Sequence, residues 1–78
     1  MKILGKKNIN ENSFNIAEIS ILATPHQLRV LAHFLLREAE LMSEFKDQYG
    51  HSHLRDDWKL WNENYTDVVV YKASEPEK

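Results

Sequence analysis

The sequence predicts an α+β fold, a two-layer sandwich in which one long helix packs on a mostly antiparallel sheet of three or four strands. Two observations predict it. One long segment repeats its apolar residues every three or four positions, as a helix face does, and shorter segments on both sides of it alternate apolar and polar residues, as strands do. With 78 residues, the chain has the size of one small domain. We expect residues 1–73 to form this domain and residues 74–78, which are polar, to form a flexible C-terminal tail.

The segment before the helix is expected to be a strand that packs one side on the helix. Residues 17–23 alternate, and their apolar members Ala17, Ile19, Ile21 and Ala23 fall on one face. The first nine residues also allow a weak edge strand around Gly5.

The helix is expected from Pro25 to about Asp47. Thr24 suits the N-cap, Pro25 suits the first helical position, and Gln27 completes a capping box three residues after Thr24. Gly50, just beyond the last periodic residue, is the expected stop signal. The apolar face covers about half of the helix circumference; it contains Leu28, Val30, Leu31, Ala32, Phe34, Leu35, Ala39, Leu41, Met42 and Phe45. The opposite side carries Arg29, His33, Arg37, Glu40 and Glu44, with Leu36 exposed among them.

Three short segments follow the helix. Residues 51–55 are expected to form a short strand, residues 62–67 a turn-rich loop, and residues 68–71 a strand of β-branched and aromatic residues. The strands on either side of the helix could alternatively form a right-handed parallel crossover, so the strand order stays open. The expected core comprises Ile19, Ile21, Leu28, Leu31, Leu35, Met42, Val68 and Val70, with Leu54 as a further candidate.

Charge is distributed unevenly along the chain. Residues 1–37 carry five basic and two acidic residues, a balance of +3, whereas residues 38–67 carry eight acidic and three basic residues, a balance of −5. A nucleic-acid binder is expected to concentrate basic charge instead, so the partner favoured here is a basic protein and not a nucleic acid. The alternative is that this charge serves solubility alone.

Composition also restricts the cellular setting and the chemistry. There is no cysteine, which excludes disulfides and thiolate catalysis, and no apolar run approaches the roughly 18 residues that span a membrane. The N-terminus lacks the apolar segment of a signal peptide. We therefore expect a cytoplasmic protein with no membrane association.

The stretch "GHSHLRDDWKLW", residues 50–61, is the densest concentration of chemically capable side chains. His51 and His53 point to one face of a strand, and Arg55 continues that row. Two imidazoles could supply half of a zinc site, but no further ligand signature accompanies them and Arg55 would place a cation beside the metal. We expect no metal and no cofactor.

An enzyme is not expected either. A histidine beside Asp56 or Asp57 could act as an acid or base in principle, but general acid–base catalysis needs a cleft that orients the pair. The chain has only two glycines, no phosphate-binding loop and no nucleophile motif.

Trp58 and Trp61 are spaced to share one side of a helical turn, and Tyr65 follows closely. Either the indoles close the end of the core, or at least one stays partly exposed and anchors a protein partner. The sequence leaves both readings open.

Three segments together resemble a known family: "EISILATPHQLRVLAHFLLREAE", "YGHSHLRDDW" and "TDVVVYKA". They are similar to immunity protein family thirty-two, small bacterial immunity proteins of polymorphic toxin systems. The resemblance covers residues 18–72; "GHSHL" and "TDVVV" are its most specific parts, and the paired tryptophans are not part of the pattern. It implies a protein that binds and occludes a toxin encoded beside it. Many such toxins are nucleases with basic clefts, which an acidic surface would complement.

We therefore expect a non-enzymatic protein-binding domain that neutralises a cognate bacterial toxin. The residues expected to contact the partner are His51, His53, Arg55, Asp56, Asp57, Trp58, Trp61 and Tyr65. The alternative is a small regulatory or scaffold domain that acts as a homodimer.

Overall fold

The computed structural model of the chain describes residues 1–7 and 16–73. The fold class is α+β, as predicted. The elements, in chain order, are β1 (Lys2–Lys7), β2 (Ile16–Leu22), α1 (Pro25–Phe45), the 3-10 turn η1 (Lys46–Gln48), β3 (His51–His53), the short helix α2 (Leu54–Asp57) and β4 (Val69–Tyr71). The expected tail, residues 74–78, and the end of the expected N-terminal strand lie outside the described residues.

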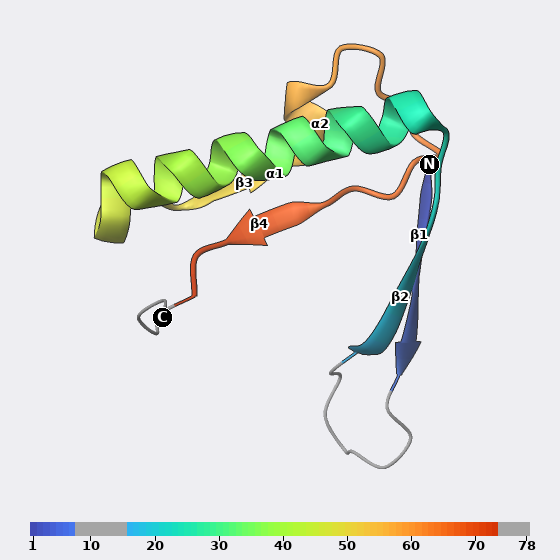
Figure 1. Cartoon of the computed structure of the whole chain (residues 1–78), viewed down its shortest axis with the longest axis horizontal. Coiled ribbons are helices and arrows are strands. Elements are labelled where there is room, and N and C mark those ends of the chain that lie inside the picture. The colour runs from blue at the N-terminus through green and yellow to red at the C-terminus, as the bar shows by residue number, and fades with distance from the viewer. Residues whose placement is uncertain (8–15, 74–78) are drawn as a thin grey trace.

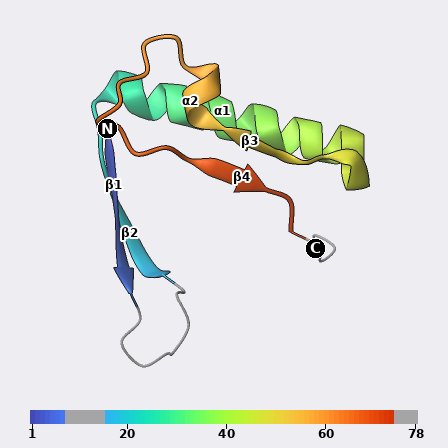
Figure 2. The same cartoon turned by 180° about the vertical axis from the view of Figure 1, so that it is seen from behind.

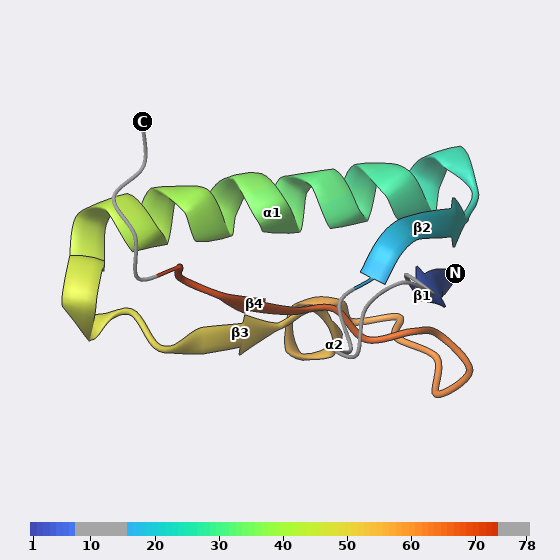
Figure 3. The same ribbon diagram turned by 90° about the horizontal axis from the view of Figure 1, so that it is seen from below.

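The four described strands form two separate antiparallel sheets, β1 with β2 and β3 with β4. The β3–β4 pair forms a layer beneath α1, whereas the β1–β2 hairpin projects away from the N-terminal end of α1 (Figures 1, 2 and 3). Within the described residues, the strands therefore do not form the expected single sheet of three or four strands, and β2 and β3 do not form a parallel crossover.

Two hydrogen bonds link the N-terminal end of β1 to Thr66, in the segment that leads into β4. The backbone N–H of Thr66 donates to the carbonyl of Met1 at 3.2 Å, and the N–H of Ile3 donates to Thr66 Oγ1 at 3.0 Å. Beyond Ile3 the chain pairs with β2 alone, so β1 diverges from the segment that leads into β4 (Figure 1).

The start of α1 follows the predicted capping box. Thr24 Oγ1 accepts from the N–H of Gln27 at 3.2 Å, and Gln27 Oε1 accepts from the N–H of Thr24 at 2.9 Å. The end differs from the prediction, because α1 stops at Phe45 and Lys46 leaves it with a positive φ of 50°. Gly50 has no positive φ, so the helix ends without using its conformational freedom.

The core lies between α1 and the layer formed by β3, α2 and the loop after α2. Its buried members are Met1, Leu31, Phe34, Leu54 and Trp58. The prediction is confirmed for Leu31 and Leu54, while Met42, Val68 and Val70 are half-buried. It is wrong for Ile19, Ile21, Leu28 and Leu35, which are exposed because the β1–β2 hairpin does not cover α1.

Strand β3 is shorter than expected. It ends at His53, and the chain turns into α2 at Leu54, whose side chain is fully buried and whose N–H donates to the carbonyl of Val68 at 2.9 Å. Arg55 consequently lies on α2 and does not continue the strand row of His51 and His53.

Candidate functional site

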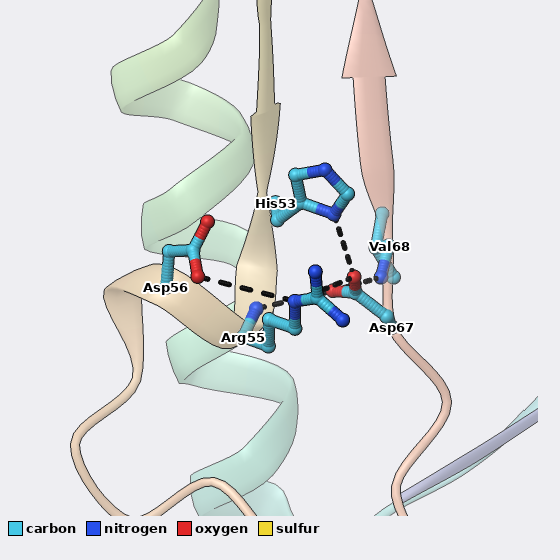
Figure 4. A network of polar contacts seen from close by, with 5 residues as sticks. All are labelled: His53, Arg55, Asp56, Asp67 and Val68. Carbon is cyan, nitrogen blue, oxygen red and sulfur yellow. Dashed lines mark hydrogen bonds and ion pairs between the residues drawn. The ribbon is translucent and has the colours of Figure 1, made fainter.

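The carboxylate of Asp67 organises the polar network at the junction of β3, α2 and β4 (Figure 4). Its Oδ2 lies 2.8 Å from His53 Nδ1 and 3.7 Å from Arg55 Nε. Its Oδ1 accepts the backbone N–H groups of Arg55 at 3.1 Å and of Val68 at 2.9 Å. Because His53 and α2 provide no side-chain cap of their own, Asp67 supplies a hydrogen-bond acceptor to the first turn of α2.

The environment of Asp67 stabilises its ionised form. Partial burial acts to raise the pKa of this carboxyl, but the hydrogen bonds from His53 and from the backbone of Arg55 and Val68 outweigh burial and lower the pKa below its usual value. Asp67 is therefore an anion that holds His53 and Arg55 in place.

A depression of about 260 Å³, open to solvent, lies beside this network. It is lined by Phe34, Arg37, His51, Ser52, His53, Asp56 and Asp57. Four of the eight predicted site residues thus share one concavity. The rings of His51 and His53 lie 5.3 Å apart, as their positions on one strand face predict, and Tyr71 stacks on His51 with ring centres 5.1 Å apart.

A buried carboxylate, that of Glu38, connects α1 to the segment that leads into β3. Glu38 is 1% exposed, and its Oε1 accepts from the hydroxyl of Tyr49 at 2.8 Å. Arg37 lies 3.4 Å from Glu38 Oε2 and forms an ion pair with Asp57 of α2 at 2.5 Å. Asp57 therefore attaches α2 to α1 and is not a free charge available to a partner.

Glu38 is ionised in spite of its burial. Burial acts to raise its pKa, but hydrogen bonds from Ser52, Tyr49 and Arg37 outweigh burial and lower the pKa below the usual value of a glutamate. The acidic balance of residues 38–67 therefore overstates the negative surface, because Glu38 faces the interior.

The aromatic residues after α2 form one cluster. Trp58, Trp61 and Tyr65 have ring centres 5.3 to 5.9 Å apart, and Gln27 Nε2 of α1 donates to the Tyr65 hydroxyl at 3.2 Å. Trp58 is only 8% exposed, so its indole belongs to the core, whereas Trp61 and Tyr65 are half-buried against it. Trp58 therefore packs in the core and is not an exposed anchor for a partner.

The chain between residues 55 and 64 forms an exposed segment above this cluster, named here the α2 loop. Figures 1 and 2 show it projecting past α1 on the side opposite to the hairpin. Leu60 is 78% exposed, and the side chain of Asp56 is 73% exposed. Apart from Trp58 and Trp61, all residues of the α2 loop are exposed, including Glu63.

Sequence reasoning missed five residues that shape this region. They are Arg37, Glu38, Leu60, Asp67 and Tyr71. The burial of Glu38 could be predicted from the sequence, because Glu38 lies seven positions after Leu31 and four after Phe34, on the same helix face. The contacts of Asp67 and Tyr71 depend on the pairing of β3 with β4, which the local pattern does not specify.

The positions of the acids and histidines restrict metal binding by the described residues. Within residues 1–7 and 16–73, no group of three or more His, Cys, Asp or Glu lies close enough to hold a metal ion. The absence of a metal in solution stays a prediction. No described helix is long and apolar enough to cross a membrane.

Comparison with known proteins found no matching family model, no similar curated protein and no similar solved structure.

Proposed function

We propose that this chain is a non-enzymatic protein-binding domain that neutralises a bacterial toxin in the cytoplasm by occluding a basic surface, with the α2 loop as the main contact. The observation that carries the proposal is the 78% exposure of Leu60 on a loop that also exposes Asp56, Lys59 and Glu63. The aromatic cluster of Trp58, Trp61 and Tyr65 packs this loop onto the core. A central apolar residue within a charged rim is the usual anatomy of a protein-binding hot spot.

The electrostatics of the site support a basic partner. Asp56 makes only a long contact with Arg55, 3.9 Å from Nε to Oδ1, and Glu63 forms no ion pair among the described residues. Both carboxylates are therefore free to steer a cationic surface, which raises the association rate more than the affinity. His51 and His53 line the neighbouring depression and would contact the same partner.

The burial and ion pairs of the expected contact residues support different roles for them. Trp58 acts from beneath as a support for the loop, and Asp57 acts through its ion pair with Arg37. Leu60 takes the place of the buried indole as the apolar anchor, with Trp61 and Tyr65 contributing their exposed edges.

The test uses the toxin domain encoded by the neighbouring gene, co-expressed with this chain and then used for binding kinetics. We expect rescue of growth and a direct complex. Leu60→Ser should weaken binding by on the order of tenfold or more, chiefly through faster dissociation. Asp56→Lys with Glu63→Lys should slow association and reduce its dependence on salt.

Two matched variants serve as controls. Leu36→Ser changes another exposed leucine, 67% exposed, and Glu40→Lys changes a carboxylate on the side of α1 opposite to Glu38. Both should leave binding unchanged. If neither rescue nor a complex is observed, the immunity function is wrong, and if the controls weaken binding as much as the loop variants, the α2 loop is not the contact.

The second candidate function is a scaffold domain that acts as a homodimer. The specific observation that favours it is the exposed apolar surface of the β1–β2 hairpin.

A further inference from the structure

One face of the β1–β2 hairpin is more apolar than the other, which carries Leu4 and Leu22 among the polar residues Lys2, Ser20, Lys6 and Glu18. Residues directly opposite in an antiparallel pair share a face, so Ile3 with Ile21 and Gly5 with Ile19 lie together. Ile16 joins them, since a Cβ built on Gly5 would lie 3.0 Å from Ile16 Cδ1. Ile3, Ile16, Ile19 and Ile21, around Gly5, are named here the hairpin apolar face.

Most of the hairpin apolar face is uncovered. Ile16 is 58%, Ile19 55% and Ile21 40% exposed, and only Ile3 packs against the core. Isolated two-stranded hairpins are marginally stable in water and need packing against another element. The hairpin has no such packing along most of its length, because it projects from the rest of the described chain (Figures 1 and 2).

Helix α1 also has an uncovered apolar surface, the second one in the described chain. Leu28, Ala32, Leu35, Ala39 and Met42 follow each other at intervals of four and three residues, which places them along one line of the helix. Leu28 and Leu35 are 45% and 44% exposed, both alanines are exposed, and Met42 is half-buried. The layer of β3 and α2 covers the neighbouring line of Leu31, Phe34 and Glu38 instead. The uncovered line is named here the helix stripe.

The two uncovered surfaces are similar in length. The seven residues of β2 extend over about 23 Å at roughly 3.3 Å per residue. The helix stripe, from residue 28 to residue 42, extends over about 21 Å at roughly 1.5 Å per residue. Small side chains at positions 32 and 39 leave room for the isoleucines of a strand pair.

We propose that two copies of this chain form a two-fold dimer in which the hairpin apolar face of each copy packs on the helix stripe of the other. Within one copy the hairpin leaves α1 at its N-terminal end and does not run along it (Figure 1). When a two-fold axis relates two copies, the hairpin apolar face of one copy packs on the helix stripe of the other. The same contact then occurs a second time with the two copies exchanged. Such an exchange is self-complementary and closes with two copies.

The surface involved suits a weak dimer. A fully buried large aliphatic side chain removes on the order of 100 Å² from water, so five that are about half exposed, namely Ile16, Ile19, Ile21, Leu28 and Leu35, would bury about 250 Å² per copy. Both copies together bury about 500 Å² of apolar area, and interfaces are about 60% apolar. The total, near 800 to 900 Å², lies just under the roughly 1,000 Å² of a specific interface. The dimer should therefore depend on concentration.

The absence of cysteine makes a disulfide test direct. Ile19→Cys and Leu35→Cys are made as separate single variants, mixed and oxidised. We expect the mixture to give a cross-linked dimer far more efficiently than either variant alone. A cross-link formed as well by Ile19→Cys alone would indicate contact between two hairpins and would overturn the proposal. So would a chain carrying both cysteines that oxidises within itself, because its hairpin would then fold back on its own helix.

Sedimentation across a range of concentrations tests the same dimer without cysteines. Leu35→Lys should raise the dissociation constant of the dimer by on the order of tenfold or more, because it places a charge in the apolar contact. Leu36→Lys and Leu4→Lys alter leucines that are 67% and 58% exposed outside both surfaces and should leave the constant unchanged. A monomer at every concentration would overturn the proposal. It would leave the function proposed for the α2 loop intact, since that function does not require a dimer.

Discussion

Glu38 is the only charged side chain that is buried among the described residues. Replacing Tyr49 with phenylalanine removes one of its hydrogen-bond donors, the Tyr49 hydroxyl. That hydroxyl donates to Glu38 at 2.8 Å, and Glu38 is 1% exposed. A hydrogen bond to a charged group contributes about 1.5 to 3 kcal/mol, and the ring itself is kept. Ser52 and Arg37 still hydrogen-bond the carboxylate, so we expect Tyr49→Phe to lower the free energy of unfolding by about 1.5 to 2 kcal/mol, at the lower end of that range.

Glu38→Ala should destabilise more. It leaves the Tyr49 hydroxyl without its acceptor, which costs about 1 to 3 kcal/mol, and it adds a cavity at a site with almost no exposure. We expect a loss of about 2 to 4 kcal/mol, which is a large part of the roughly 4 to 12 kcal/mol available to a domain of this size.

The two changes should not be additive, because both remove the same hydrogen bond. A double-mutant cycle, measured by urea unfolding with the fluorescence of Trp58 and Trp61 as the probe, should give a coupling of about 1 to 2 kcal/mol. Glu40→Ala on the opposite side of α1 is the control and should change stability by less than about 0.5 kcal/mol. A coupling indistinguishable from zero would show that Glu38 does not hold Tyr49, and the account of the α1–β3 junction would be wrong.

Three further predictions concern stability. Because the pKa of Asp67 is lower in the folded than in the unfolded state, its ionised form raises the free energy of unfolding. This contribution to stability is complete above the unfolded-state pKa, near 4, and is lost as the pH falls through the lower folded-state pKa. Asp67→Asn should therefore weaken the loss of stability between neutral and acidic pH in urea unfolding curves. Leu31→Ala should cost about 2 to 5 kcal/mol, whereas Leu35→Ala at concentrations where the protein is monomeric should cost less than about 1 kcal/mol, so equal costs would refute the observed burial. EDTA should leave the melting temperature unchanged, and a tight zinc isotherm abolished by replacing both His51 and His53 would contradict this.

The elements that the sequence predicted well are those specified by local interactions. The start of α1 depends on Thr24 and Gln27, which contact each other within one turn, and the pattern of apolar residues then sets the length of the helix. The shared face of His51 and His53 follows from the two-residue period of a strand.

The pairing of strands could not be predicted in the same way. The alternation in residues 17–23 indicates that one face is apolar but does not specify whether α1 or another element covers it. In the structure, β2 pairs with β1 and no other described element covers its apolar face, so half of the apolar residues of α1 are also exposed. The role of Asp67 could not be predicted for the same reason, because its contacts with His53 and Arg55 join segments twelve or more residues apart.

The two surfaces proposed for binding lie on opposite sides of α1. Leu35 of the helix stripe and Arg37 beside the depression are two residues apart, which places them about 200° from each other around the helix. The covered line of Leu31, Phe34 and Glu38 lies between them. A dimer formed through the stripe would thus leave Arg37, the depression and the α2 loop accessible on each copy. Two toxin molecules could then be held by one dimer, and a change at Leu35 should alter the size of the complex without altering the affinity of each loop for its partner.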